Sequence, residues 1–95
     1  MTRREQICRE RLRAQMHVQP IQHGEVCIFC PAAIADRFYQ HLVAKRISTS
    51  TPKRAIFGRY PEDELIAALP LDVAQAEISE FVATLPEPCY ERDVN

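Results

Sequence analysis

The alternation of apolar and polar positions divides the chain into seven predicted elements. In chain order these are a helix at residues 2–16, strands at 18–22 and 25–29, a helix at 31–47, a strand at 54–58, and helices at 61–69 and 72–85. The order α-β-β-α-β-α-α predicts an α+β fold in which about four helices pack on a short three-stranded sheet. We expect a small single domain, residues 1–95, with a basic N-terminal helix at 1–17 and a short C-terminal tail at 86–95.

The first helix is predicted to have one apolar side and one basic side. Cys8, Leu12 and Met16 recur at intervals of four residues, which places them on one stripe of a helix. Arg9 and Arg13 are predicted on the opposite, outer side. We therefore expect this helix to pack through the apolar stripe and to expose its arginines.

Two short segments around His23-Gly24 predict a β-hairpin. Glycine readily adopts the positive φ that a two-residue hairpin turn requires. Pro20 has no N–H to donate to a neighbouring strand, so the first strand must lie at a sheet edge. The strand at 25–29 ends in a continuous apolar run, which is typical of a strand covered on both faces.

The helix at 31–47 is predicted to be the most buried one. Pro31 suits the first helical position, which makes Cys30 the expected N-cap residue. The strands at 25–29 and 54–58 flank this helix at the spacing of a right-handed βαβ crossover, so we expect these two strands to be parallel. The apolar stripe of the helix at 31–47 contains Ile34, Phe38 and Leu42, with Tyr39 and Val43 beside them.

The last two helices are predicted from prolines, acids and an apolar stripe. The helix at 61–69 begins with Pro61 and carries three acids in its first turn, where the helix dipole favours negative charge. Asp72 is the expected cap of the final helix. The apolar stripe of that final helix consists of Ala74, Ile78, Phe81, Val82 and Leu85.

The composition is that of an ordinary globular domain, but the charge is unevenly distributed. Of the 95 residues, 46% are hydrophobic and 26% are charged. Residues 1–60 carry eleven Lys and Arg against four acids (+7), whereas residues 61–95 carry one Arg against nine acids (−8). This asymmetry predicts a basic and an acidic surface that serve a partner or face each other in a homodimer.

The longest apolar run, residues 26–35, contains a proline and is too short to cross a bilayer. It also follows a charged lead that is unlike a signal peptide. We therefore expect a cytoplasmic protein with no membrane partner. In such a reducing compartment, the four cysteines are expected to be unpaired.

Cys27 and Cys30 form the one motif with chemical potential. A cysteine at a helix N-terminus has a stabilised thiolate, so Cys30 is the expected reactive thiol, with Cys27 beside it. The order strand, CxxC, helix resembles that of thioredoxin-like proteins over about a third of the chain, which implies a thiol-redox role. A structural zinc site needs four ligands, for which the sequence offers one CxxC and scattered candidates. Simple packing of two buried cysteines is the favoured reading, so we expect no metal and no cofactor.

Basic residues supply the remaining candidate site. Those proposed to contact a partner or nucleic acid are Arg3, Arg4, Arg9, Arg13, Lys53, Arg54 and Arg59. No aromatic residues alternate with them to stack on bases, which favours a protein partner over nucleic acid.

Catalytic motifs are missing from the sequence. There is no Gly-rich phosphate loop, HExxH or GxSxG, and the three histidines are isolated in the sequence. We therefore expect no enzyme but a small regulatory or adaptor protein, of the inhibitor or modulator type, that binds a protein partner through charged helical surfaces. A nucleic-acid-binding regulator using the basic N-terminal face is the first alternative. A thiol-redox or zinc-stabilised domain built on Cys27 and Cys30 is the second.

Overall fold

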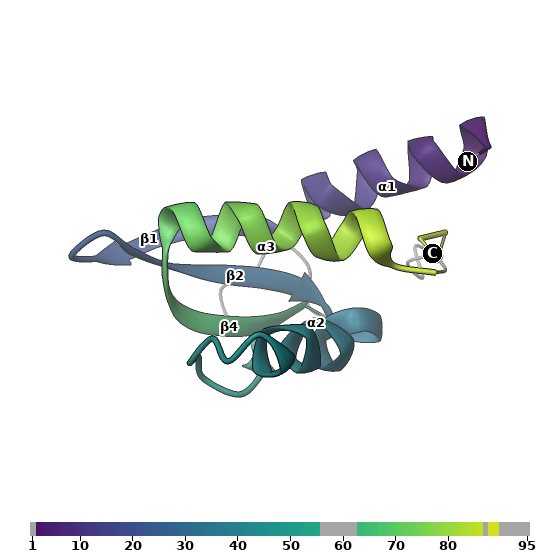
Figure 1. Ribbon diagram of the computed structural model, residues 1–95. Coiled ribbons are helices and arrows are strands. Elements are labelled where there is room, and N and C mark those ends of the chain that lie inside the picture. Colours follow the sequence, from purple (N-terminus) through teal and green to yellow (C-terminus); the bar gives the residue numbers. More distant parts are fainter. Residues whose placement is uncertain (1, 56–62, 87, 90–95) are drawn as a thin grey trace.

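The computed structural model describes residues 2–55, 63–86 and 88–89, which fold as three helices and a four-stranded sheet. The elements are α1 (Arg3–Gln15), β1 (His17–Gln22), β2 (Glu25–Pro31), α2 (Ala32–Ala44), β3 (Lys53–Arg54), β4 (Asp63–Pro70) and α3 (Leu71–Thr84). All neighbouring strands are antiparallel, in the order β1-β2-β4-β3 (Figure 1). The predicted α+β class is confirmed, but the predicted numbers of helices and strands were wrong.

The predicted hairpin is present, as β1 and β2. His23 and Gly24 both have positive φ, at 53° and 77°, as a type I′ turn requires. This turn twists in the same sense as the strands it joins. β1 is an edge strand, which confirms the position inferred from Pro20.

The segment predicted as a helix at 61–69 is instead strand β4, as far as it is described. Asp63–Pro70 pairs with β2 on one side and with β3 on the other. Alanine, leucine and glutamate favour helix only weakly, by less than about 1 kcal/mol per residue. Pairing with β2 from Asp63 to Pro70, and with β3 at Glu64 and Leu65, outweighs that preference, because it provides partners for backbone N–H and C=O groups.

The two strands of the predicted βαβ crossover are parallel, as expected, but they are not neighbours in the sheet. β2 and β3 are both antiparallel to β4 and therefore parallel to each other, and β4 lies between them. The described part of the predicted strand at 54–58 contributes only Arg54 to β3, which begins at Lys53. Residues 56–58 lie outside the described chain.

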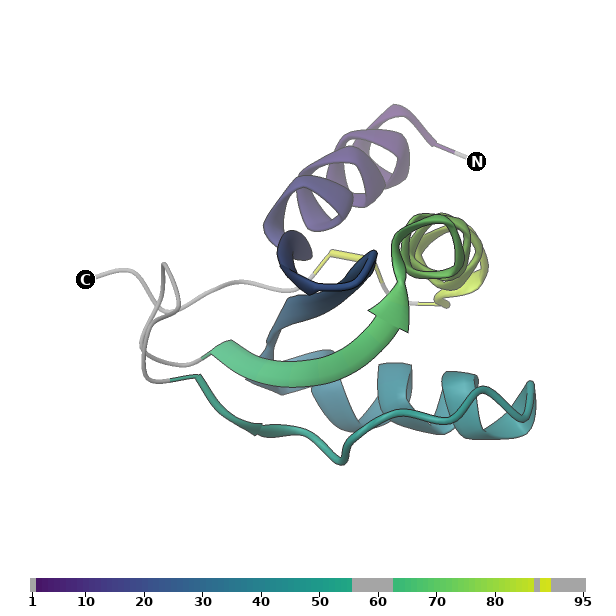
Figure 2. The same ribbon diagram turned by 90° about the vertical axis from the view of Figure 1, so that its left-hand side faces the viewer.

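Helices α2 and α3 bury their predicted stripes in one core. Ile34, Phe38 and Leu42 of α2 are buried, and Phe38 packs against Phe81 of α3 with 5.1 Å between ring centroids. Val43 was wrongly placed in the buried stripe, since it is 46% exposed. The core face of the sheet is formed by Val26, Ile28, Cys30, Ile66 and Leu69. Figure 2 looks along α3, which lies above one end of the curved strand β4 in this view, whereas α2 lies below β4.

The predicted caps of α2 and α3 were each one or two residues away from the observed ones. α2 begins at Ala32 with Pro31 as N-cap, so Cys30 is not its cap but the last core-facing residue of β2. α3 begins at Leu71 with Pro70 as N-cap, and Asp72 lies in its first turn. A carboxylate there still interacts favourably with the helix dipole.

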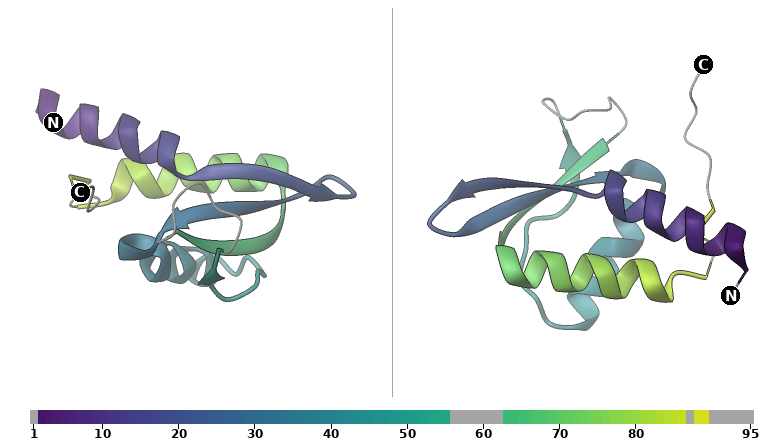
Figure 3. Two further views of the ribbon diagram at one scale, coloured as in Figure 1. Left: turned by 180° about the vertical axis from the view of Figure 1, so that it is seen from behind. Right: turned by 90° about the horizontal axis from the view of Figure 1, so that it is seen from above.

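Helix α1 extends past the end of the sheet and packs beside α3 (Figure 3). Leu12 and the C-cap residue Met16 are buried, as predicted, whereas Arg9 is not on the outer side. The Arg9 guanidinium donates hydrogen bonds to the carbonyl oxygens of Val82 and Leu85 at the end of α3, the latter at 2.9 Å. The prediction placed Arg9 on the wrong side because its spacing from Leu12 and Met16, three and seven residues, puts it on their side.

A disulfide joins Cys8 of α1 to Cys89 beyond α3, which corrects the expectation that these two cysteines are unpaired. Their Cα atoms are 5.1 Å apart, although 81 positions separate them in the sequence. Cys27 and Cys30 are not disulfide-bonded. None of the described helices is long and apolar enough to span a membrane.

Candidate binding site on the open face of the sheet

The two faces of β2 meet different surroundings, although both are apolar. Alternate residues of a strand point to opposite sides. Val26 and Ile28 therefore face the helices, whereas Cys27 and Phe29 face the other way. An antiparallel sheet with one face in solvent normally carries polar residues on that face. Cys27 and Phe29 depart from this pattern, and both are buried, at 8% and 5% exposure.

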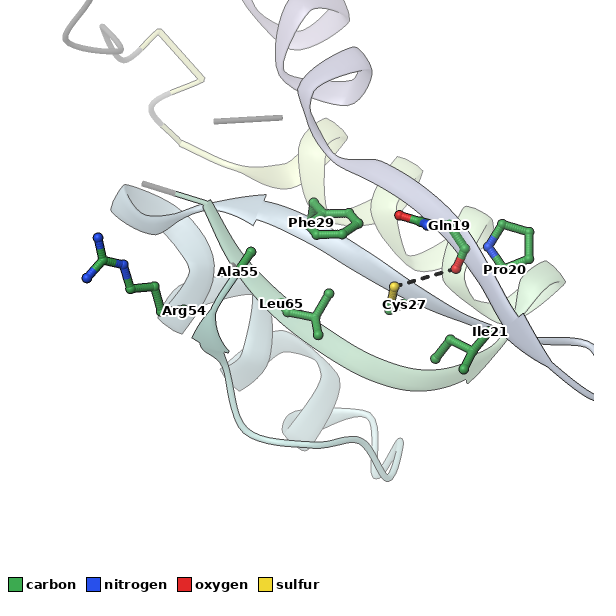
Figure 4. A pocket seen from close by; sticks show the side chains of 8 residues that line it. All are labelled: Gln19, Pro20, Ile21, Cys27, Phe29, Arg54, Ala55 and Leu65. Carbon is green, nitrogen blue, oxygen red and sulfur yellow. Dashed lines mark hydrogen bonds between the residues drawn. The ribbon is translucent and has the colours of Figure 1, made fainter. Parts of the chain in front are cut away.

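Cys27 and Phe29 form a second, smaller apolar cluster with Ala55, Leu65 and Ala67. We call this side of the sheet the open face, because among the described residues no helix packs on it. Figure 4 views it directly, with the helices behind the strands. His17 stacks on Phe29, with 5.8 Å between ring centroids, and extends the cluster toward α1.

The open face contains a pocket of about 510 Å³, within the ordinary size range of ligand sites. Its described lining comes from β1, β2, β4 and the segment at β3: Gln19, Pro20, Ile21, Cys27, Phe29, Arg54, Ala55 and Leu65 (Figure 4). Most of these side chains are apolar, and Arg54 is the one charged residue among them. The pocket is open to solvent along the sheet and not enclosed.

Cys27 provides the thiol of this pocket. Its Sγ donates a hydrogen bond to the carbonyl oxygen of Gln19 across the hairpin, at 3.5 Å. Burial raises the pKa of the Cys27 thiol above its ordinary value, against smaller opposing contributions from backbone hydrogen bonds at Cys27 and Gln19. The thiol is therefore protonated at neutral pH and is a poor nucleophile.

The structure does not bring the two sulfurs of the CxxC motif together. Cys27 points to the open face, whereas Cys30 is fully buried in the helix-covered core. Three residues along a strand span about 10 Å, which is too far for a disulfide without moving the backbone. The arrangement does not favour a redox or zinc role for this pair.

The predicted basic residues do not form one surface. Arg3, Arg4 and Arg13 are exposed on α1, whereas Arg9 holds the end of α3. Lys53 and Arg54 are exposed on β3, at the sheet edge opposite to β1. Arg59 lies outside the described residues. Nucleic-acid binding through the N-terminal face thus stays a prediction that rests on three arginines of α1.

A cluster of polar side chains, separate from the apolar pocket, connects α2 to α3 and was not predicted. His41 and Lys45 of α2 contact Glu77 and Glu80 of α3, and we call these four residues the interhelical cluster. Burial of Glu77 disfavours its charged form, but hydrogen bonds from Lys45 and His41 outweigh this effect and lower the pKa of Glu77. Hydrogen bonds to Glu77 and Glu80 raise the pKa of Lys45. A signal was available, since Glu77 interrupts the apolar stripe between Ala74 and Ile78.

No known protein family matches this chain, and neither a curated protein nor a solved structure shows significant similarity to it.

Proposed function

We propose that this protein is a small non-enzymatic binding protein that holds an apolar side chain of a protein partner in the pocket of the open face. The observation that carries the proposal is the apolar pocket on the side of the sheet away from the helices. The sequence predicted that the partner binds to charged helical surfaces. In this proposal, the partner binds instead to the open face of the sheet. A protein that binds a partner without catalysing a reaction would act as a regulator or an adaptor.

The charge around the pocket favours an acidic partner segment. Arg54 lies at the edge of the pocket, with its guanidinium directed away from the other lining side chains (Figure 4), and Lys53 precedes it on the same edge strand; both are exposed. No acidic residue belongs to the lining that the structure describes. A partner segment with an aliphatic or aromatic residue beside Asp or Glu therefore matches both the apolar wall and the basic rim.

A protein segment suits the shape of the pocket better than a small molecule does. Small-molecule sites usually bury most of the ligand surface, in a cleft or cavity. Here the pocket is open along the sheet, and Ile21 at its side is 48% exposed. Such a surface leaves room for the backbone that would carry a bound side chain.

The proposal is tested by selecting binders from a displayed library of random twelve-residue peptides. We expect enriched peptides to combine a large apolar residue with Asp or Glu, and synthetic copies to bind less tightly as salt increases. Ile21→Asp places a charge at the pocket and should weaken binding by at least about tenfold. Val43→Asp is the matched control, because Val43 is 46% exposed but lies on α2.

Peptides that bind wild type and Ile21→Asp equally would show that the open face is not the site. Failure to select any peptide, together with Ile21-dependent binding of the anionic dye anilinonaphthalene sulfonate, would identify a small amphipathic ligand instead. Selection of basic peptides would contradict the proposed role of Arg54 and Lys53.

A further inference from the structure

The interhelical cluster gathers three potential metal ligands from two helices. His41 Nε2 lies 2.9 Å from Glu77 Oε1 and 3.3 Å from Glu80 Oε2. One nitrogen and two carboxylate oxygens thus lie within 4.8 Å of one another. The spacing of Glu77 and Glu80, three residues along α3, places both carboxylates on the side of α3 that faces His41.

These separations resemble those between ligands around a small divalent ion. Zinc binds imidazole nitrogen and carboxylate oxygen at about 2.0–2.2 Å, which for tetrahedral geometry separates neighbouring ligand atoms by about 3.3–3.6 Å. The 3.3 Å contact between His41 and Glu80 fits this range, and the 2.9 Å contact between His41 and Glu77 has to lengthen when the ion binds. A mixed set of one imidazole and two carboxylates suits zinc and related transition metals better than magnesium or calcium, which prefer oxygen ligands alone.

The ligands are also held in place by their surroundings. The His41 ring stacks on Phe38 at 6.1 Å and meets Phe81 edge-on at 5.5 Å, measured between ring centroids. Glu77 is buried beside these rings, whereas Glu80 is exposed. A fixed imidazole and a buried carboxylate lose little conformational freedom when they bind an ion, and the exposed carboxylate leaves a path for its entry.

Lys45 supplies the positive charge at this place. Its Nζ lies 2.8 Å from Glu77 Oε1 and 2.6 Å from Glu80 Oε2, so the ammonium group contacts the same two oxygens that contact His41. The Lys45 side chain is 38% exposed and flexible, and it can turn outward into water. A lysine alone would neutralise much of the carboxylate charge. His41 Nε2 also hydrogen-bonds Glu77 Oε1, so without an ion these four side chains form a polar network, and an ion has to displace the hydrogen bonds of both Lys45 and His41.

We propose that His41, Glu77 and Glu80 form a binding site for a divalent transition-metal ion such as Zn²⁺, and that the ion displaces the ammonium group of Lys45 and the proton on His41 Nε2, which is released to water while neutral imidazole keeps its proton on Nδ1. The fourth ligand is water, since three protein ligands leave one tetrahedral position. Such an ion would link α2 to α3 on the helix-covered side of the sheet. This site is independent of the pocket on the open face, and each stands or fails separately.

The experiment titrates the full chain, freed of metal with a chelator, with Zn²⁺ against a fluorescent zinc indicator. We expect Glu80→Gln and His41→Gln to weaken binding by at least about tenfold, because each removes one of three ligands. Lys45→Met should strengthen binding by about tenfold or more, because it removes the competing cation and leaves the ligands intact. His23→Gln, in the exposed hairpin turn, is the control and should bind as wild type does.

Two further measurements keep the test decisive. Co²⁺ bound at this site should show visible absorption without the intense near-ultraviolet band of thiolate ligation, which excludes Cys27 as the ligand. Zn²⁺ should raise the melting temperature of wild type but not of Glu80→Gln, whose exposed position leaves the fold intact. Equal affinity of wild type and Glu80→Gln, or no gain in Lys45→Met, would overturn the proposal and leave an ion-pair network only. Failure of wild type to bind Zn²⁺ at about 1 mM would do the same.

Discussion

Two cysteines three positions apart in one strand have very different surroundings. Cys27 lines a pocket that is open to solvent and retains 8% exposure, whereas Cys30 is fully buried under the helices. The sequence suggested the reverse order of reactivity, because Cys30 was expected to cap α2. The residue before a proline-initiated helix is a sound candidate for a cap, but here Pro31 itself takes that position. Single-residue boundaries of this kind depend on backbone dihedral angles that sequence patterns do not specify.

Alkylation of the native protein should therefore modify Cys27 first and slowly. Burial raises the pKa of the Cys27 thiol above that of an ordinary cysteine, so at pH 7.5 its thiolate fraction, and hence its rate with iodoacetamide, should be lower than that of a free cysteine. The rate should keep rising with pH beyond pH 9. Cys30 should react only after unfolding. Peptide mass spectrometry gives both rates, and a faster reaction at Cys30 would contradict the assignment of the two faces.

At the scale of elements, α1 is attached to the body by few contacts. Leu12 is the buried residue of the helix itself, and Met16 adds a second at its C-cap. Arg9 contributes a polar attachment, because its guanidinium satisfies carbonyl groups at the end of α3 that have no partner within the helix. Its positive charge also interacts favourably with the negative end of the helix dipole.

Arg9→Met should lower the free energy of unfolding by about 1.5–3 kcal/mol, the range for hydrogen bonds to charged groups. The lower half of that range is favoured, because Arg9 Nε is buried without a partner and its desolvation already costs stability. Arg13→Met is the control on the same helix and should change stability by less than about 0.5 kcal/mol, since Arg13 is exposed. Urea unfolding followed by circular dichroism measures both variants. Similar losses in the two would indicate that Arg9 is only a surface residue.

Most elements were predictable from the sequence because their apolar periods are long or their turns are specific. The stripes of α2 and α3 and the turn at His23-Gly24 belong to this group. β4 was not predicted, because its composition favours a helix and only pairing with β2 and β3 makes it a strand. Its apolar run is short, from Leu65 to Leu69, and closely followed by Pro70, a length more typical of a strand.

At the scale of the whole molecule, the candidate sites depend on segments that are distant in sequence. The pocket needs β4 between β2 and β3, so it could not be predicted while that segment was taken for a helix. The interhelical cluster needs α2 beside α3, which no local pattern specifies. The opposite charges of the two halves meet there in part, because Lys45 pairs with Glu77 and Glu80. Some of the opposite charges of the two halves of the chain therefore pair with each other inside the folded protein.

The disulfide between Cys8 and Cys89 also acts at this scale, because it joins positions near the two ends of the chain. Crosslinking residues 81 positions apart removes much of the conformational freedom of the unfolded chain, worth about 2–5 kcal/mol. A disulfide persists in oxidising surroundings, so the cytoplasmic location expected from the sequence stays a prediction.

Reduction should therefore lower the melting temperature of wild type, and α1 should lose hydrogen-exchange protection before the sheet does, because it is otherwise held by few contacts. The double variant Cys8→Ser/Cys89→Ser should melt at the temperature of the reduced wild type and show no response to reductant. Cys27→Ala, whose thiol is free, should respond to reductant as wild type does. A thiol assay on the unreduced, denatured chain should detect two thiols from the four cysteines, since one disulfide consumes the other two. Four thiols would mean that no covalent bond holds α1 to the rest of the fold. The hydrogen bonds of Arg9 should then supply the larger part of the free energy that holds α1 in place.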